Sequence, residues 1–201
     1  MGTMRDRMVE AGMTLFGERG YDATSVADIQ LACGLTAGSG ALYKHFPSKQ
    51  ALLAEGVRRY VASVERSRAG LMEILPDDPR QALEMIAGAV AAAMAGDGPV
   101  IRVVLRDLER FPDLLAELWD GLLAALYVEI ANWLRGQQDR GRITVTDPAA
   151  TAAVLLASLT YYRILEALIA RTPGDVDLPA FLAAWVDSAA ATLHLSPGGK
   201  P

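Results

Sequence analysis

The sequence predicts an all-α protein with about nine helices. Strand signals are nearly missing, because the only short β-branched run covers residues 142–146 and sits between Gly141 and Pro148 like a loop. Elsewhere apolar residues recur at helical spacing, and Gly, Pro and Asp divide them into segments. A composition of 52% hydrophobic and 21% charged residues is typical of a globular chain that buries a sizeable core.

The first two helices are predicted from their stop and start signals. Gly20 ends an opening helix whose apolar residues share one face. Ser25 begins the second helix, since Ser25 and Asp28 have the spacing of a capping box, and Gly34 ends it. Together with a third short helix, these two helices predict a compact unit within the first fifty residues.

The remaining helices follow in the same way. A third short helix is expected, with Thr36 or Ser39 as its cap, and a fourth, long helix from Ser48 to about Leu75. The next helix is capped by Asp78, with a proline in its first turn. This helix is predicted to cover residues 80–95. Four more are predicted over residues 99–111, 113–138, 148–170 and 178–195. Residues 196–201 hold no apolar side chain, and we expect a flexible tail there.

The charge distribution limits where the chain would meet nucleic acid. The whole chain has a net charge of −5, but residues 1–70 hold nine Lys and Arg against seven Asp and Glu. Any affinity for phosphate therefore belongs to the N-terminal third.

Cysteine usage and the absence of a targeting pattern indicate a cytoplasmic protein. Cys33 is the only cysteine, so neither an intrachain disulfide nor a thiolate-rich zinc site is expected. Charged residues at positions 5, 6, 7 and 10 interrupt any signal-peptide core. Only 15 residues separate Asp147 from Arg163, too few for a membrane span. We expect no membrane association, no metal and no cofactor.

Three strings carry the functional prediction: LFGERGYDATSVADI at residues 15–29, CGLT at 33–36 and LYKHFPSKQALL at 42–53. They lie on two helices separated by a turn with a glycine, which is the outline of a DNA-binding helix-turn-helix. Over about residues 5–55 the chain closely resembles the DNA-binding domain of the TetR family of transcriptional regulators. The resemblance implies a helix-turn-helix domain at 1–47 and a helical effector-binding and dimerisation domain at 48–195, joined by the long helix.

The resemblance also implies which side chains touch DNA. Tyr43 and His45 look like the family's pair that donates hydrogen bonds to phosphate oxygens, Ser25 is similar to its phosphate-contacting hydroxyl, and Lys49 adds a cation at a helix N-terminus. The complete predicted DNA-binding set is Thr24, Ser25, Thr36, Ala37, Gly38, Ser39, Gly40, Ala41, Tyr43, Lys44, His45 and Lys49.

Two departures from the family pattern affect this prediction. Seven residues separate Gly34 from Leu42, where the commoner pattern has five, so the turn or the start of the recognition helix must be longer. Two glycines disfavour helix there, so an extended turn over residues 36–39 is the alternative to a helical start, and residues 35–41 hold no Arg, Asn or Gln for bidentate base contacts. Gln30 stands where the family usually has Ala, and an inward-facing amide needs partners.

The larger helical region is predicted to bind a small, largely apolar effector and to form a homodimer on a near-palindromic operator. By analogy with the family, candidate effector residues are Met85, Leu105, Trp119, Leu122, Tyr127, Tyr161, Tyr162 and Leu165. Candidate dimer-interface residues lie on the last two helices: Leu156, Thr160, Ile164, Phe181 and Trp185. For each of these residues a plain core role is the alternative.

Two other classes of function, an enzyme and a helical adaptor, fit the sequence less well. An enzyme is not expected, because His45 and His194 are the only histidines and no Gly-rich phosphate loop or metal-ligand cluster occurs. A helical adaptor that binds a protein partner without DNA would use the same apolar helices, but it would not need the LYKHFPSK string. The sequence therefore predicts a DNA-binding repressor released by its effector.

Overall fold

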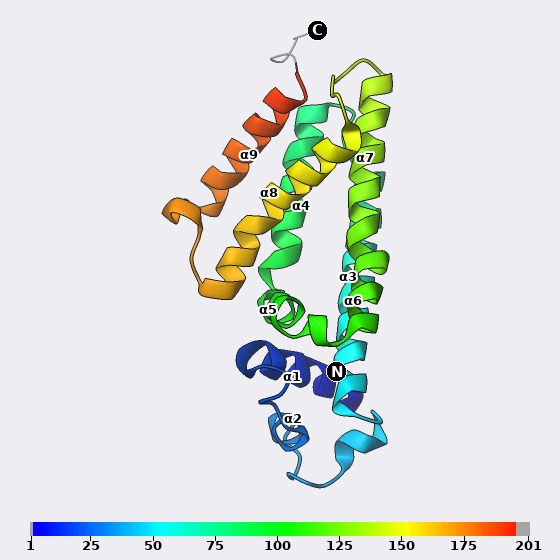
Figure 1. Ribbon diagram of the computed structural model, residues 1–201, viewed down its shortest axis with the longest axis vertical. Coiled ribbons are helices and arrows are strands. Elements are labelled where there is room, and N and C mark those ends of the chain that lie inside the picture. The colour runs from blue at the N-terminus through cyan, green and yellow to red at the C-terminus, as the bar shows by residue number, and fades with distance from the viewer. Residues whose placement is uncertain (1, 196–201) are drawn as a thin grey trace. The chain divides into compact units, whose positions relative to one another are not determined.

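Every regular element in the computed structural model is a helix across the described residues, 2–195 (Figure 1). The all-α prediction is confirmed, and the predicted count of about nine is close. The α-helices are α1 (Met4–Arg19), α2 (Val26–Ala32), α3 (Lys49–Glu73), α4 (Pro79–Ala95), α5 (Gly98–Arg106), α6 (Pro112–Leu118), α7 (Ala124–Asp139), α8 (Pro148–Ile169) and α9 (Leu178–Thr192). A π-helical turn, Trp119–Leu123, joins α6 to α7, and 3-10 helices cover Ala41–Lys44, Leu108–Arg110 and Pro173–Asp175.

Helix starts follow the capping signals of the sequence. The predicted Ser25–Asp28 capping box is present at α2, and Asp78 caps α4, where its side chain accepts from the Gln81 N–H and Pro79 occupies the first turn. An unpredicted capping box of Thr3 and Asp6 starts α1. These side chains bond N–H groups that a helix end leaves without partners.

Of the two alternatives for residues 36–39, the structure has the extended turn and not the start of a helix. Residues 36–40 form a turn, and only the 3-10 helix Ala41–Lys44 follows. Gly38 has φ +74° and Gly40 has φ +65°, both in the left-handed region that helices exclude. The sequence string Gly-Ser-Gly therefore ends regular structure here instead of capping a helix.

The first of two compact units comprises the described residues up to Val64 together with Asp97–Gly121. Within it α1 packs on α2 and α5. Its core contains Met8, Phe16, Ile29, Leu42 and Leu52, none of them exposed to solvent. The arginines of α5 bind the end of α1, since Arg102 Nε donates to the Gly17 carbonyl oxygen at 3.1 Å and Arg106 donates to that of Phe16.

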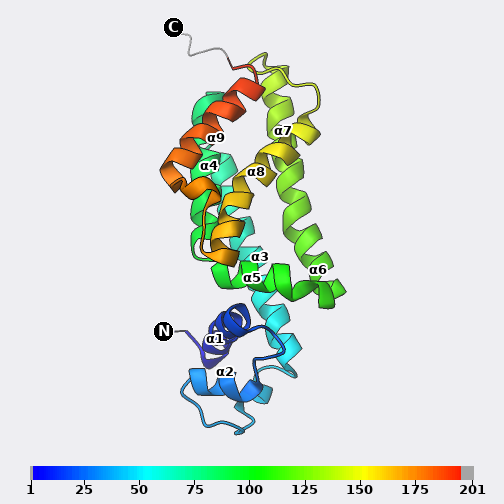
Figure 2. The ribbon, with the colours of Figure 1, turned by 60° about the vertical axis from the view of Figure 1, so that its left-hand side comes forward.

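The second unit comprises Glu65–Gly96 and the described residues from Leu122 onward. In it α8 packs against α4 and α7, and α9 packs against α4 (Figure 2). Leu83, Leu134, Leu159 and Leu193 lie at the centre of its core. These packing units are not the predicted domains, whose boundary at residue 47 stays a prediction, and the predicted tail at 196–201 lies outside the described residues.

Among the described residues, α8 is the one helix that by length and composition alone would pass as a membrane span. Core helices of soluble proteins have the same properties. Ala152, Leu155 and Leu159 on its inner face are buried in the core of the second unit.

Candidate nucleic-acid interface

One stretch of the first unit carries lysines without carboxylates. No Asp or Glu occurs from residue 29 to residue 54, whereas Lys44 and Lys49 lie within it. The stretch covers the second half of α2, the loop 33–48 and the start of α3. Because each phosphate of DNA carries a negative charge, this is the part of the unit best suited to approach it.

Tyr43, Lys44 and His45 are all exposed, and the side chain of Tyr43 is 59% accessible. Leu42 and Phe46 on either side of them are buried, so they fix the 3-10 helix to the core. A phenol hydroxyl, an ammonium and an imidazole N–H can each donate to a phosphate oxygen. The structure thus gathers three of the predicted contact residues on one firmly held segment.

Residues 36–40, which precede the 3-10 helix Ala41–Lys44, form the turn described above. Thr36, Ala37, Gly38 and Ser39 are exposed, and Gly40 and Ala41 are half-buried. A Cβ atom added at Gly38 or Gly40 would meet nothing within 4 Å, so the backbone angle, not close packing, is what calls for glycine there. Five of these six predicted residues, at 36–40, therefore lie on a loop instead of a recognition helix, and Ala41 is the first residue of the 3-10 helix that carries Tyr43.

The hydroxyl groups of Thr24 and Ser25 both make hydrogen bonds within the protein. Thr24 is fully buried, and its Oγ1 lies 2.8 Å from the carbonyl oxygen of Gly20 and 3.2 Å from that of Leu15, so its hydroxyl serves the turn between α1 and α2. Ser25 is exposed, but its Oγ donates to Asp28 Oδ2 at 2.6 Å. Ser25 and Asp28 together cap α2. Of Thr24 and Ser25, only Ser25 has a side chain at the surface.

Lys49 is turned inward. Its Nζ donates to the carbonyl oxygens of Tyr21 at 2.8 Å and Thr24 at 2.9 Å, and it lies over the Tyr21 ring. Burial raises the pKa of the Tyr21 phenol, so the ring under the ammonium is neutral. Two of the three ammonium hydrogens are thereby used within the protein, and the predicted phosphate contact is left to the third.

Gln30 belongs to the site although it was not among the predicted contact residues. Its side chain is 1% exposed, its Oε1 accepts from the Gly38 N–H at 3.2 Å, and its Nε2 donates to Ser39 Oγ at 3.4 Å. These are the partners that an inward-facing amide needs. The signal in the sequence was a polar residue at a position where small apolar residues are usual.

The predicted effector residues do not all belong to one unit. Leu105 and Trp119 lie in the first unit and are about half exposed, at 49% and 52%. Leu122 and Tyr162 are buried in the second, and the Tyr162 hydroxyl donates to the Val176 carbonyl oxygen at 2.9 Å. The other four are in the second unit, where Tyr161 is exposed and Met85, Tyr127 and Leu165 are half-buried.

Of the predicted dimer residues on α8 and α9, two are buried and three are half-buried. Leu156 and Trp185 are each 7% exposed, and Trp185 Nε1 donates to Ser158 Oγ at 3.0 Å. Thr160 donates to the Leu156 carbonyl oxygen, and Ile164 and Phe181 are half-buried. Leu156 and Trp185 therefore join α8 and α9 within one chain.

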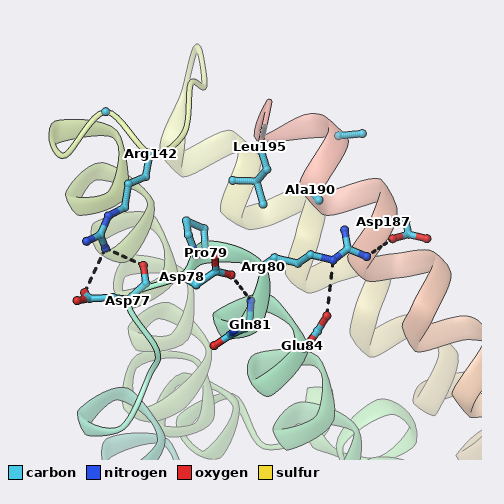
Figure 3. A pocket seen from close by; sticks show the side chains of 12 residues that line it. Asp77, Asp78, Pro79, Arg80, Gln81, Glu84, Arg142, Asp187, Ala190 and Leu195 are labelled. Atoms are coloured by element: carbon cyan, nitrogen blue, oxygen red, sulfur yellow. Dashed lines mark hydrogen bonds and ion pairs between the residues drawn. The ribbon is translucent and has the colours of Figure 1, made fainter. Parts of the chain in front are cut away.

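A hollow of about 1110 Å³ opens at one end of the second unit (Figure 3). Its charged side chains are paired: Arg142 with Asp77, at 3.1 Å, and Arg80 with Asp187 and Glu84. None of the predicted effector residues lines it. Among the described residues, no group of three or more His, Cys, Asp and Glu gathers as metal ligands.

Comparisons with known proteins identify curated relatives of this chain. It is 36% identical over 138 residues to the HTH-type transcriptional repressor KstR2 of Rhodococcus jostii, a match that covers 60% of this chain and 64% of that protein. It is 30% identical over 98 residues to the repressor DhaR of a Mycobacterium, covering 49% of this chain and 48% of DhaR. The chain thus spans less than two thirds of the length of each of these two curated relatives.

Solved structures share the fold over nearly the whole chain. A bacterial regulatory protein of the tetR family from Rhodococcus RHA1 superposes with a TM-score of 0.75 at 18% identity, covering 98% of this chain and all of that one. PfmR, a TetR family transcriptional regulator from Thermus thermophilus, has a TM-score of 0.73 at 23% identity and covers 99% of this chain and all of that one.

Two family descriptions match the sequence directly. Residues 8–55 match "Bacterial regulatory proteins, tetR family", and residues 81–192 match "AefR-like transcriptional repressor, C-terminal domain". The family and the matched relatives are transcriptional regulators and not enzymes. The chain belongs to the TetR family of bacterial regulatory proteins.

Proposed function

We propose that this chain is a DNA-binding transcriptional repressor, which binds a near-palindromic operator as a homodimer in the cytoplasm and is released by a small, largely apolar effector. The observation that carries the proposal is the exposed group of Tyr43, Lys44 and His45 within a stretch free of carboxylates. The matched regulators and repressors support it.

The DNA-binding part is tested by fluorescence anisotropy on duplexes from the chain's own upstream region, over a series of salt concentrations. Wild-type affinity should fall steeply with salt, and Lys44→Ala should lower the slope of log K against log salt by about 1. Tyr43→Ala should weaken binding without changing that slope, because a phenol carries no charge. Arg140→Ala, which removes an exposed cation of the second unit, is the matched control and should change neither value.

Binding that does not depend on salt, or Lys44→Ala and Arg140→Ala behaving alike, would contradict the proposed interface. The adaptor hypothesis predicts that Lys44→Ala and Arg140→Ala behave alike, because a protein that binds only another protein does not need phosphate donors at particular positions. The two functions are therefore separated by one titration.

The proposed dimer surface is the outer face of α8 and α9. On α8 exposed residues recur at spacings of three and four, and they include Val154, Tyr161 and Leu168 at 66%, 56% and 43% accessibility. On α9 the exposed positions include Ala180, Ala183, Ala184 and Ala191. Small and apolar side chains on two neighbouring helices suit close packing against a second copy.

Light scattering at micromolar concentration tests this surface. Wild type should have the mass of a dimer, and Val154→Glu should shift it toward the monomer, because the new carboxylate would be buried without a partner. Val128 on α7 is similarly exposed, at 59%, so Val128→Glu should remain a dimer. A monomeric wild type would exclude the proposed interface.

The effector is proposed to bind in the second unit, next to the half-buried Met85, Tyr127 and Leu165. Helix α3 runs from the first unit into the second, so a ligand that favours one arrangement of α3 shifts DNA affinity by its differential binding. A screen of small apolar compounds for increased thermal stability tests this. A true effector must both raise the melting temperature and weaken operator binding.

A further inference from the structure

The amide of Gln30 is a buried polar group with two partners in the candidate DNA interface. Burying an amide without hydrogen bonds is unfavourable, and the family's usual residue at this place is small and apolar. Here Gln30 is 1% exposed, and both ends of its amide contact the loop 36–40, through the Gly38 N–H at 3.2 Å and Ser39 Oγ at 3.4 Å. The side chain therefore links the inside of α2 to the loop.

The loop has little other support. Its backbone bonds run from the Ser39 N–H to the Thr36 carbonyl oxygen at 3.3 Å and, at its end, from the Tyr43 N–H to the Gly40 carbonyl oxygen at 3.1 Å, while Gly38 and Gly40 have left-handed angles that helices exclude. Thr36, Ala37, Gly38 and Ser39 are all exposed, so their own packing does not hold them. A flexible loop has to lose conformational entropy before it can match a base sequence. The Gln30 amide is placed to reduce that loss.

The direction of the two hydrogen bonds matters for Ser39. Because the Gly38 N–H is a donor, the atom facing it must be Oε1, which leaves Nε2 as the donor to Ser39 Oγ. The Ser39 oxygen accepts this bond, so its own proton is free to be donated outward. Acceptors for such a proton occur on phosphates and on the major-groove edges of guanine, adenine and thymine.

We propose that Gln30 is the positioning residue that sets the DNA sequence preference of this chain, by holding residues 36–40 in one conformation with the Ser39 hydroxyl turned outward as a donor. This rests on the proposed DNA-binding function. Gln30 itself is buried and touches no base. It acts through Gly38 and Ser39, and it compensates for the two additional residues of the loop.

The experiment begins with selection of bound duplexes from a random pool by the wild-type protein. Affinities for the selected duplex and a scrambled one are then compared at one salt concentration. Gln30→Met keeps the length of the side chain and removes the amide, and it should reduce the preference for the selected duplex by about tenfold. Binding to the scrambled duplex and the salt slope should stay unchanged, because the phosphate donors remain. Gln81→Met, the same change at an exposed site on α4, is the control.

Ser39→Ala completes a double-mutant cycle. If Gln30 acts through Ser39, the double variant should lose no more preference than Gln30→Met alone. Equal preference in wild type and Gln30→Met would overturn the proposal. If Gln30→Met does not fold, Ser39→Ala decides alone, since Ser39 is exposed and its loss leaves the core intact. Unchanged preference in Ser39→Ala would then refute the inference.

Amide hydrogen exchange separates this proposal from the proposed function. The Gly38 N–H should be protected in the wild-type protein without DNA and lose protection in Gln30→Met, while the α2 amides keep theirs. A Gly38 amide that exchanges as fast as an open loop in wild type overturns the role of Gln30 whatever the DNA result. Absence of binding to any duplex by the wild type would instead refute the DNA-binding function.

Discussion

The ammonium nitrogen of Lys49 lies 4.1 Å from the centroid of the Tyr21 ring and 2.8 Å from the carbonyl oxygen of the same residue. Lys49 is the first residue of α3, and Tyr21 follows the end of α1. A third contact reaches the carbonyl oxygen of Thr24, just before α2. One side chain thus joins three helices of the candidate DNA interface, at carbonyl groups that would otherwise require water.

Lys49→Met should destabilise the first unit by about 2 kcal/mol, because hydrogen bonds to a charged group are lost. Urea unfolding followed by circular dichroism measures this. Lys44→Met, which removes an exposed ammonium, should leave the free energy of unfolding unchanged. The opposite pattern, with normal stability and a salt slope reduced by about 1, would show that the Lys49 ammonium binds phosphate instead.

The absence of a side chain at Gly17 allows α1 and α5 to approach each other closely. A Cβ atom at this position would lie 2.6 Å from Pro99 Cα and 2.7 Å from the Pro99 carbonyl oxygen, and the backbone cannot move away as a flexible side chain would. Gly17→Ala should therefore destabilise the unit by about 1–3 kcal/mol. Gly88→Ala, at a helical position with nothing within 4 Å, should be neutral or stabilising. Equal unfolding midpoints for the two variants would show that α5 does not pack on Gly17.

Signals confined to a few neighbouring residues allowed most of the fold to be predicted. Ser25 with Asp28, and Asp78 before Pro79, specify helix starts through bonds within three residues, and both predictions are confirmed. For residues 36–40 the sequence left two alternatives, because Ser39 is a residue type that caps helices whereas Gly38 and Gly40 disfavour helix, and the left-handed angles of both glycines in the structure decide for the turn. Residue type alone does not state which conformation a glycine takes.

The sequence could predict those parts of the candidate site in which the exposure of a side chain follows from the local pattern of apolar and polar residues. Tyr43, Lys44 and His45 lie between the apolar Leu42 and Phe46, which have helical spacing, so their exposure could be predicted. The inward direction of Lys49 depends on Tyr21, 28 residues earlier, and no local pattern carries that pairing. Thr24 likewise turns inward, to the carbonyl oxygens of Leu15 in α1 and of Gly20 directly after it. Contacts between separate elements, such as that of Lys49 with Tyr21, decide which polar residues are structural.

Acid should weaken the start of α1. Hydrogen bonds from the Thr3 side chain and backbone, together with Arg59, lower the pKa of Asp6 from 3.8 to about 2. Because the folded pKa lies below the unfolded value, the stabilisation is present above about pH 4 and is lost as the pH falls toward 2. An NMR titration of the Asp6 carboxyl carbon should have its midpoint near 2. Asp6→Asn should unfold with less dependence on pH over this range, and an unchanged dependence would contradict the assignment.

Substitution of Gly38 tests whether the left-handed turn is required at the candidate interface. At φ +74° an alanine is strained although its Cβ would meet no atom within 4 Å, so Gly38→Ala should destabilise the turn by about 1–2 kcal/mol. Gly38→Asn should be tolerated better, because Asn adopts left-handed angles more readily than Ala. Gly70→Ala, in open space within α3 and with no left-handed angle, controls for the added methyl group. If the turn presents Ser39 to DNA, preference for a selected duplex should follow the order Gly, Asn, Ala at position 38. Alanine matching glycine in that assay would mean that the turn is free to rearrange when DNA binds.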